Sequence, residues 1–342
     1  MATILKTKSL YYPDVNLIAQ VGQVKSRADV PKELRRIIVS PMMAVVGEKF
    51  AVAAAKLGLT VCLHRFGTPE SQRDIYEKID HDWGNKYNTQ NVYCSVGLDD
   101  ADRIGYLTNF SSPRKWCLDC ANGYMPQIKE SLSKMLDMTE IESLVIGNIH
   151  SLEGFYYLSE ICKDLEIPEL IVRVGIANGR PCSTSDVVGV NRGQITEIME
   201  CVEGKSSNDN WSQLKSYICA DGGIHKGSSA CKALAAGADY IMLGGYFMNA
   251  LEAESNLNGD GAYWGGASHK QQILTHGKIV RHSEGKEINE IRELKPLKEL
   301  VEDLWSGIAS YVSYSGYSTL TEAIGNGIFE IKQNSLPPKN RV

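Results

Sequence analysis

The chain has 342 residues, of which 43% are hydrophobic and 23% are charged, a composition typical of a globular protein. Its formal net charge is −5, from 36 basic and 41 acidic residues, so no broad positive field favours nucleic-acid binding. No apolar run is long enough to cross a bilayer, and nine cysteines without metal-ligand spacing indicate a reducing compartment, so we expect a cytoplasmic protein without membrane segments.

Short apolar, β-branched runs alternate along the chain with segments of helical spacing. Eight such runs, roughly 25–30 residues apart, predict an α/β fold, a (β/α)8 TIM barrel in one domain over 1–342. An open doubly wound sheet is the structural alternative, but it usually has fewer strands. The predicted strands are 37–40, 60–64, 91–96, 116–120, 143–147, 170–174, 217–220 and 240–243, and the predicted helices between them include 47–57, 69–79, 124–138, 152–165, 194–202 and 228–236.

The pattern changes after the eighth predicted strand. Residues 254–290 are rich in Gly, Ser, His and Asn and have little apolar periodicity, which predicts a long mobile flap, with a disordered insert as the alternative. Residues 297–311 return to helical spacing and are predicted to close the barrel. The tail, 334–342, is predicted to be loose.

A cysteine lies in the glycine-punctuated loop after the sixth predicted strand. Burial is the ordinary role of a free cysteine, but Arg180 and Pro181 beside Cys182 make a poor context for it. A thiol on a loop at the carboxyl end of a barrel strand is suited to attack on an electrophilic carbon. Thr184 is a candidate proton relay if a carboxylate assists it. Glu284, in the predicted flap, is a candidate for that carboxylate, and a solvated surface charge is its alternative interpretation.

Two glycine pairs, Gly222-Gly223 and Gly244-Gly245, follow the seventh and eighth predicted strands. These loops are the usual phosphate site of such barrels. Tight turn geometry explains either pair alone, whereas both pairs together favour a phosphate. Asp221 directly precedes the first pair and is a candidate for binding ribose hydroxyls, with helix capping as the alternative.

In their order, these motifs resemble those of the IMP dehydrogenase/GMP reductase family. The resemblance covers most of the chain, and it implies that Cys182 attacks C2 of a purine nucleoside 5′-monophosphate, GMP or IMP. The segments that carry it are 25–30 (KSRADV), 118–124 (LDCANGY), 147–148 (GN), the Cys182 loop, 220–224 (ADGGI), 232–239 (KALAAGAD) and 242–244 (MLG).

Two reactions are open within that family. IMP dehydrogenase uses an Arg-Tyr pair on the flap, and residues 266–290 contain no such dipeptide. GMP reductase has a Ser-Glu-Gly-Lys segment, which residues 283–286 reproduce, and its glutamate works with the threonine two residues past the cysteine. The resemblance therefore implies NADPH-dependent reductive deamination of GMP, with Cys182, Thr184 and Glu284 as catalytic residues. NAD-dependent oxidation of IMP to XMP and a catalytically weakened nucleotide-binding barrel are the alternatives.

The resemblance also implies binding residues, some of them from a neighbouring subunit of a homotetramer. Potassium would bind at Ala177, Gly179 and Cys182, although Ala177 stands where the family has a glycine, and Arg180 replaces a serine near the phosphate. The implied substrate residues are Asp221, Gly222, Gly223, Gly244, Gly245, Ser268, Arg281 and Gly285. The implied NADPH residues are Ser26, Arg27, Arg65, Asp119, Cys120, Ala121, Ala267, Ser310 and Ser313.

Overall fold

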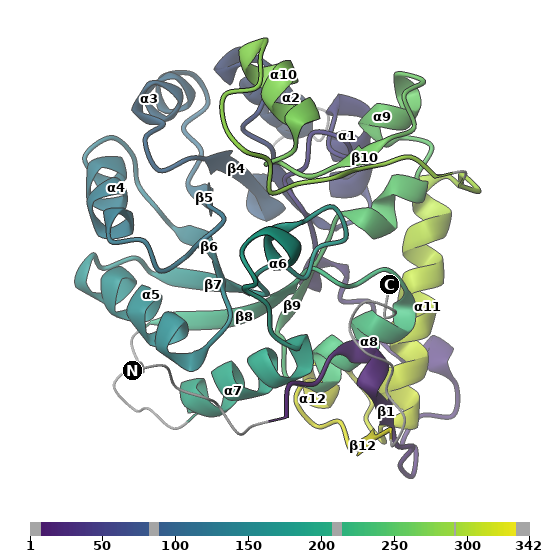
Figure 1. Ribbon diagram of the computed structural model, residues 1–342. Coiled ribbons are helices and arrows are strands. Elements are labelled where there is room, and N and C mark those ends of the chain that lie inside the picture. Colours follow the sequence, from purple (N-terminus) through teal and green to yellow (C-terminus); the bar gives the residue numbers. More distant parts are fainter. Residues whose placement is uncertain (1–7, 82–88, 207–213, 291, 333–342) are drawn as a thin grey trace.

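A closed barrel of parallel strands forms the centre of the computed structural model, which describes residues 8–81, 89–206, 214–290 and 292–332 (Figure 1). Each strand pairs with the next along the chain, and β9 pairs with β2 to close the ring. The predicted (β/α)8 barrel is confirmed. Its strands are β2 (Ile37–Val39), β3 (Thr60–Leu63), β4 (Val92–Val96), β5 (Lys115–Asp119), β6 (Ser143–Ile149), β7 (Glu169–Val174), β8 (Lys215–Asp221) and β9 (Tyr240–Leu243).

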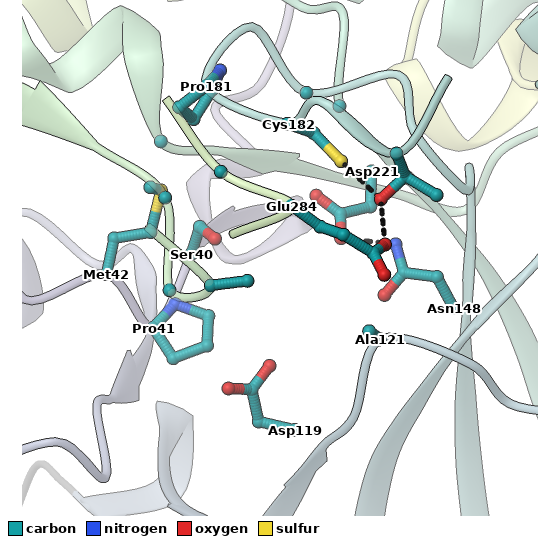
Figure 2. Close-up of a pocket in the computed structure, with 18 of the residues that line it drawn as sticks. Ser40, Pro41, Met42, Asp119, Ala121, Asn148, Pro181, Cys182, Asp221 and Glu284 are labelled. Carbon is teal, nitrogen blue, oxygen red and sulfur yellow. Dashed lines mark hydrogen bonds between the residues drawn. The ribbon is translucent and has the colours of Figure 1, made fainter. Parts of the chain in front are cut away.

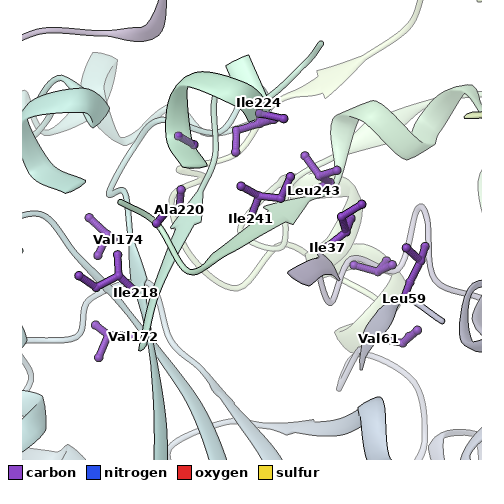
Figure 3. Close-up of a cluster of buried hydrophobic side chains, with 14 of the residues drawn as sticks. Ile37, Leu59, Val61, Val172, Val174, Ile218, Ala220, Ile224, Ile241 and Leu243 are labelled. Atoms are coloured by element: carbon purple, nitrogen blue, oxygen red, sulfur yellow. The ribbon is translucent and has the colours of Figure 1, made fainter. Parts of the chain in front are cut away.

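Apolar side chains cover both faces of the strands, because one face fills the barrel and the other packs under the helices. Figure 3 shows part of the outer set, which includes Val172, Val174 and Ile241. The inner set takes one buried residue from each barrel strand: Ile38, Cys62, Tyr93, Cys117, Val145, Ile171, Cys219 and Met242. Of the cysteines in or next to these strands, Cys62, Cys94, Cys117 and Cys219 are buried, whereas Cys120 is only partly buried.

Helices form an outer ring around the strands (Figure 1). In α4 the buried Ile128, Leu132 and Met135 follow helical spacing, so this helix turns one apolar face to the barrel. The final long helix, α11, contacts α1 and α8 and so takes the eighth position, as predicted. The ring helices are α1 (Glu48–Lys56), α2 (Pro69–His81), α3 (Ala101–Phe110), α4 (Gln127–Leu136), α5 (Leu152–Asp164), α7 (Gln194–Ser206), α8 (Gly227–Ala235) and α11 (Leu297–Tyr314).

The segment 254–290, called the flap segment below, contains short regular elements. Helices α9 (Glu254–Leu257) and α10 (His269–His276) lie in it, and β10 (Tyr263–Trp264) pairs antiparallel with β11 (Glu287–Ile288). The Trp264 indole donates to Gln271 Oε1 at 3.0 Å, which fastens α10 to this hairpin. The mobility of the flap segment stays a prediction.

The remaining elements lie at the edges of the fold. Strand β1 (Val15–Leu17) pairs antiparallel with β12 (Phe329–Ile331), and short helices α6 (Thr184–Val187) and α12 (Leu320–Ala323) follow β7 and α11. The tail 334–342 lies outside the described residues. Among the helices described, none has both the length and the apolar character that a membrane crossing requires.

Candidate active site

A cavity of about 730 Å³ opens at the carboxyl ends of the barrel strands. Its volume lies in the range typical of small-molecule sites. Loops after β2, β3, β4, β5, β7, β8 and β9 and the end of β6 line it together with the flap segment, so the polar and glycine-rich strand ends surround one space. Figure 2 shows Cys182, Asp221 and Glu284 pointing into that space from three separate parts of the chain.

The loop after β7, residues 175–184, is called the nucleophile loop below. It begins at a glycine that no other residue replaces without strain. Gly175 has a φ of 135°, and a Cβ there would lie 2.1 Å from the backbone oxygen of Asp221. Further along, the Cys182 N–H donates to the Gly179 carbonyl at 2.9 Å, forming a tight turn. The turn presents Cys182 at the cavity as a partly exposed thiol, not as a core residue.

Cys182, Thr184 and Glu284 form a continuous hydrogen-bonded chain. The Cys182 thiol donates to Thr184 Oγ1 at 3.2 Å, and Thr184 Oγ1 donates to Glu284 Oε2 at 2.8 Å. Backbone bonds hold the flap segment in this register: Ser183 N–H donates to the Glu284 carbonyl at 2.9 Å, and Lys286 N–H donates to the Pro181 carbonyl at 2.6 Å. Glu284 is therefore positioned over the thiol rather than directed to solvent as a surface charge.

Both glycine pairs line the same cavity. Gly222 and Gly223 have φ values of 90° and 69°, so turn geometry requires glycine there. Gly244 instead meets a packing limit, since a Cβ would lie 2.6 Å from the sulfur of Met42. Turn geometry thus explains the first pair but not the second, and the backbone of both is open to a ligand.

A buried arginine that the sequence analysis did not single out joins two acidic residues at the base of the cavity. Arg173 donates to Asp119 Oδ1 at 2.9 Å and, through Nε and Nη2, to Asp221 Oδ2 at 3.0 and 2.9 Å. Asn148 Nδ2 donates to the same Asp221 oxygen at 2.8 Å. Burial alone would lower the pKa of Arg173, but Asp221 and Asp119 raise it well above its ordinary value. Asp221 is not a helix cap, because Lys226 occupies the N-cap position of α8.

Five of the residues implied for NADPH line the cavity, namely Arg65, Asp119, Cys120, Ala121 and Ala267. Arg65 Nε lies 3.4 Å from Asp119 Oδ2, and the Arg65 guanidinium lies 5.0 Å from the centroid of the Phe66 ring. Burial, followed by the charge of Asp119, raises the pKa of Cys120 to about 12, and its thiol donates to the Gly147 carbonyl at 2.9 Å. Cys120 is thus a protonated wall residue and not a second nucleophile.

The other four residues implied for NADPH do not line this cavity. Arg27 lies in the short 3-10 helix Arg27–Asp29, which contacts α11, and its Nη1 donates to Ser310 Oγ at 3.2 Å. Ser26 is exposed and caps the same turn, and Ser313 is partly buried on α11. Within one subunit these four residues form a separate patch.

Of the residues implied for the substrate, Ser268 lies beside the cavity and the rest line it. The Ser268 hydroxyl accepts from Gln271 N–H at 3.1 Å and caps α10, and its backbone bridges to Gly285. Ser268 therefore holds α10 and Gly285 of the flap segment together. Arg281 and Gly285 line the cavity from that segment directly.

The residues predicted to bind potassium lie in a tight turn of the nucleophile loop. The Gly179 carbonyl accepts the Cys182 N–H at 2.9 Å, and Ala177 holds a left-handed φ of 63°. A potassium site there stays a prediction. Elsewhere in the described ranges, no three His, Cys, Asp or Glu side chains gather as a metal ion would require. We assign no chemical step to a metal.

Comparison with known proteins gives a match over nearly the whole chain. Residues 10–335 match the family model described as the IMP dehydrogenase / GMP reductase domain. A protein of Caenorhabditis elegans named GMP reductase is 25% identical over 353 aligned positions, which cover 96% of this chain and 93% of that relative. Proteins with the same name from Phytophthora infestans and Klebsiella pneumoniae are each 26% identical, cover 92% of this chain, and are themselves covered to 88% and 92%.

Proposed function

Because this chain belongs to the IMP dehydrogenase / GMP reductase family of NAD(P)-dependent purine nucleotide oxidoreductases, we propose that it converts GMP to IMP and ammonia with NADPH. The observation that carries this proposal is the hydrogen-bonded chain from Cys182 through Thr184 to Glu284. A carboxylate that reaches a thiol through one hydroxyl suits a reaction in which a proton must leave the nucleophile and return to an amine.

The first step forms a carbon–sulfur bond. The thiol proton of Cys182 passes through the Thr184 hydroxyl to Glu284, and the thiolate attacks C2 of the purine. The 2-amino group of GMP is then the leaving group. Glu284 returns a proton through Thr184 to this amino group, the C2–N bond breaks, ammonia departs, and a thioimidate joins C2 to Cys182.

The second step reduces C2. NADPH, when bound, supplies the hydride that this carbon receives. The C2–S bond then breaks, the electron pair returns to Cys182 as thiolate, and IMP leaves with hydrogen at C2. One proton from solvent then restores the thiol for the next cycle. Glu284 starts the cycle as a base and ends its first half as an acid, so one carboxylate serves both proton transfers.

We infer one orientation for a mononucleotide in this cavity. The backbone of the two glycine pairs would face the phosphate, and Asp221, held by Arg173 and Asn148, would face the ribose. Arg281 and Gly285 in the flap segment, with Ser268 beneath them, cover the base. This orientation directs C2 toward the Cys182 thiol.

The cofactor side fits a dinucleotide that two subunits share. Arg65, Asp119, Cys120, Ala121 and Ala267 would hold its reactive end, because they line the same cavity as Cys182. The patch of Ser26, Arg27, Ser310 and Ser313 would contact the cofactor of a neighbouring subunit, in keeping with the proposed homotetramer.

Incubation of the purified chain with each nucleotide tests the proposal. We expect NADPH loss and equimolar ammonia with GMP, and no NADH formation with IMP and NAD. Cys182→Ala should abolish turnover, and mass spectrometry of the trapped wild-type protein should find the purine on the peptide that contains Cys182. NADH formation from IMP would instead establish the dehydrogenase reaction, and tight GMP binding without turnover would establish a binding protein.

A further inference from the structure

One arginine at the cavity has no part in the proposed chemistry. Arg180 lines the cavity, and the residue before it lies against the first glycine pair, since a Cβ on Gly222 would lie 2.9 Å from the backbone nitrogen of Gly179. A Cβ on Gly245 would lie 3.3 Å from the Tyr263 ring and 3.4 Å from His225 Nδ1, so both rings stand against this glycine loop. Burial, followed by the positive charge of Arg180, lowers the pKa of His225, whose ring lines the same cavity.

The other arginines of the cavity have different partners or positions. Within the described lining, the arginines are Arg65, Arg173, Arg180 and Arg281. Arg65 pairs with Asp119, and Arg173 pairs with both Asp119 and Asp221, at the base of the cavity. The glycine loops offer N–H groups but no positive charge. Arg281 belongs to the flap segment, which the proposed function sets over the base. Among these four arginines, Arg180 is therefore the one placed to balance an anion at the glycine loops.

In this structure the Arg180 guanidinium is paired with a carboxylate of the same chain. Arg180 Nη1 donates to Glu290 Oε2 at 2.9 Å, and Nη2 donates to Glu290 Oε1. The side chains are 34% and 40% exposed, so the pair is open to competition by another anion. Glu290 follows β11 closely, and the pair links the nucleophile loop to the end of the flap segment.

We propose that Arg180 binds the 5′-phosphate of the nucleotide and exchanges Glu290 for it when the nucleotide enters. A guanidinium holds a phosphate with the same two-point geometry as a carboxylate, and the phosphate dianion carries the larger charge. The inference rests on the proposed function, because that function places the phosphate at the glycine pairs. It adds that Arg180 contributes to selection of a nucleotide over its nucleoside.

The test measures binding of GMP and of guanosine, which lacks the phosphate, by calorimetry to the full chain. We expect Arg180→Ala to weaken GMP binding by about 10–100-fold and to change guanosine binding less than about twofold. Arg180→Lys should recover part of the GMP affinity. Glu290→Gln removes the competing charge and should tighten GMP binding by about threefold or more, with guanosine unchanged.

A matched control separates phosphate binding from simple loosening of the flap segment. Lys286 Nζ lies 2.6 Å from Asp186 Oδ2, and this ion pair also ties the flap segment to the nucleophile region without lining the cavity. Asp186→Asn should leave both affinities unchanged. If wild type and Arg180→Ala bind GMP with equal affinity, the inference is overturned and the proposed function is not. Wild-type protein that binds no purine nucleotide overturns the proposed function, and the inference with it.

Discussion

Thr184 and Glu284 lie 100 residues apart in the sequence, yet the Thr184 hydroxyl donates to the Glu284 carboxylate at 2.8 Å. The backbone sets this contact, because Ser183 N–H donates to the Glu284 carbonyl at 2.9 Å and Cys182 bridges to Gly285. The flap segment thus pairs with the nucleophile loop through its backbone, in the way that a neighbouring strand would. The proposed proton transfer from the thiol depends on this backbone pairing.

Removal of the carboxylate charge should separate chemistry from binding. Glu284→Gln keeps an oxygen that accepts from Thr184 but no longer takes a proton. We expect kcat for GMP to fall about 100- to 1000-fold while KM changes only a few-fold. Thr184→Val should give a similar loss and Thr184→Ser a much smaller one. Steady-state assays of ammonia release measure all three.

The neighbouring hydroxyl provides the control for that series. Ser185 follows Thr184 directly and does not line the cavity. Ser185→Ala should therefore leave kcat within about twofold of wild type, since surface substitutions away from special contacts change little. A Glu284→Gln variant with full kcat would remove Glu284 from the mechanism.

Arg173 should matter to both stability and substrate binding. Arg173→Met leaves Asp119 and Asp221 without their shared cation, and their side chains are only 18% and 13% exposed. Loss of one partner from a buried ion pair costs about 3–5 kcal/mol of unfolding free energy. We expect a loss of that order in urea unfolding, and a raised KM for GMP in any fraction that folds.

An exposed ion pair gives the comparison. Arg114 Nη2 lies beside Glu140, with side chains 59% and 76% exposed. Arg114→Ala should change the unfolding free energy by less than about 1 kcal/mol. Equal effects of the two substitutions would show that the Arg173 network contributes nothing special.

The barrel was predictable because its strands are buried on both faces. Runs of mostly apolar residues, such as 143–147 and 170–174, are typical of such strands. Helix α3 was absent from the predicted segments, because its buried face combines only Ile104 and Leu107 with a charged residue, Arg103. Arg103 donates to Gln72 Oε1 at 3.0 Å, a contact between α3 and α2 that no local pattern reveals.

The site was predictable only in part. Cys182 and Thr184 stand out locally, whereas the role of Glu284 came from the resemblance, since nothing within the flap segment indicates what it approaches. Arg173 was missed because it was taken as part of an apolar strand. A cationic residue inside the otherwise apolar run 170–174 was the available signal, because a buried cation needs a buried partner.

Gly175 offers a test of how closely the loops after β7 and β8 must approach. Gly175→Ala would place a Cβ 2.1 Å from the Asp221 backbone oxygen at a φ of 135°. Strain of this kind costs about 1–3 kcal/mol before the loops move, and the movement should lower kcat as well. In contrast, Gly307→Ala in α11 meets nothing within 4 Å and should stabilise the protein by about 0.5–1 kcal/mol. Thermal unfolding of the two variants should shift in opposite directions.

Glu197 on α7 is a buried carboxyl behind the nucleophile loop. Its Oε2 accepts from Asn178 Nδ2 at 3.2 Å, and its Oε1 has no hydrogen-bond partner among the described residues. Burial raises the pKa of Glu197 to about 9, although Arg192 opposes the shift; Glu200 adds to it. The carboxyl is therefore protonated in the folded protein at neutral pH.

This proton makes stability depend on pH in a stated direction. The folded state keeps the proton up to about pH 9, whereas the unfolded chain loses it near pH 4.5, the ordinary value. Between these values the folded state binds more protons, so the unfolding free energy falls as pH rises. Glu197→Gln mimics the protonated form, and we expect it to raise the unfolding free energy by roughly 2–4 kcal/mol at pH 8 and by much less at pH 5.5.

Urea unfolding of wild type and variant across pH 5.5 to about pH 8.5 measures the difference between their slopes, which cancels the titration of other groups. The matched control is Glu130→Gln, since Glu130 is an exposed carboxylate whose pKa is lowered by its hydrogen bond to Lys134. Glu130→Gln should show the same slope of unfolding free energy against pH as the wild type. Parallel slopes for wild type and Glu197→Gln would mean that Glu197 is ionised in the folded protein, with a cation or water meeting its unpaired oxygen.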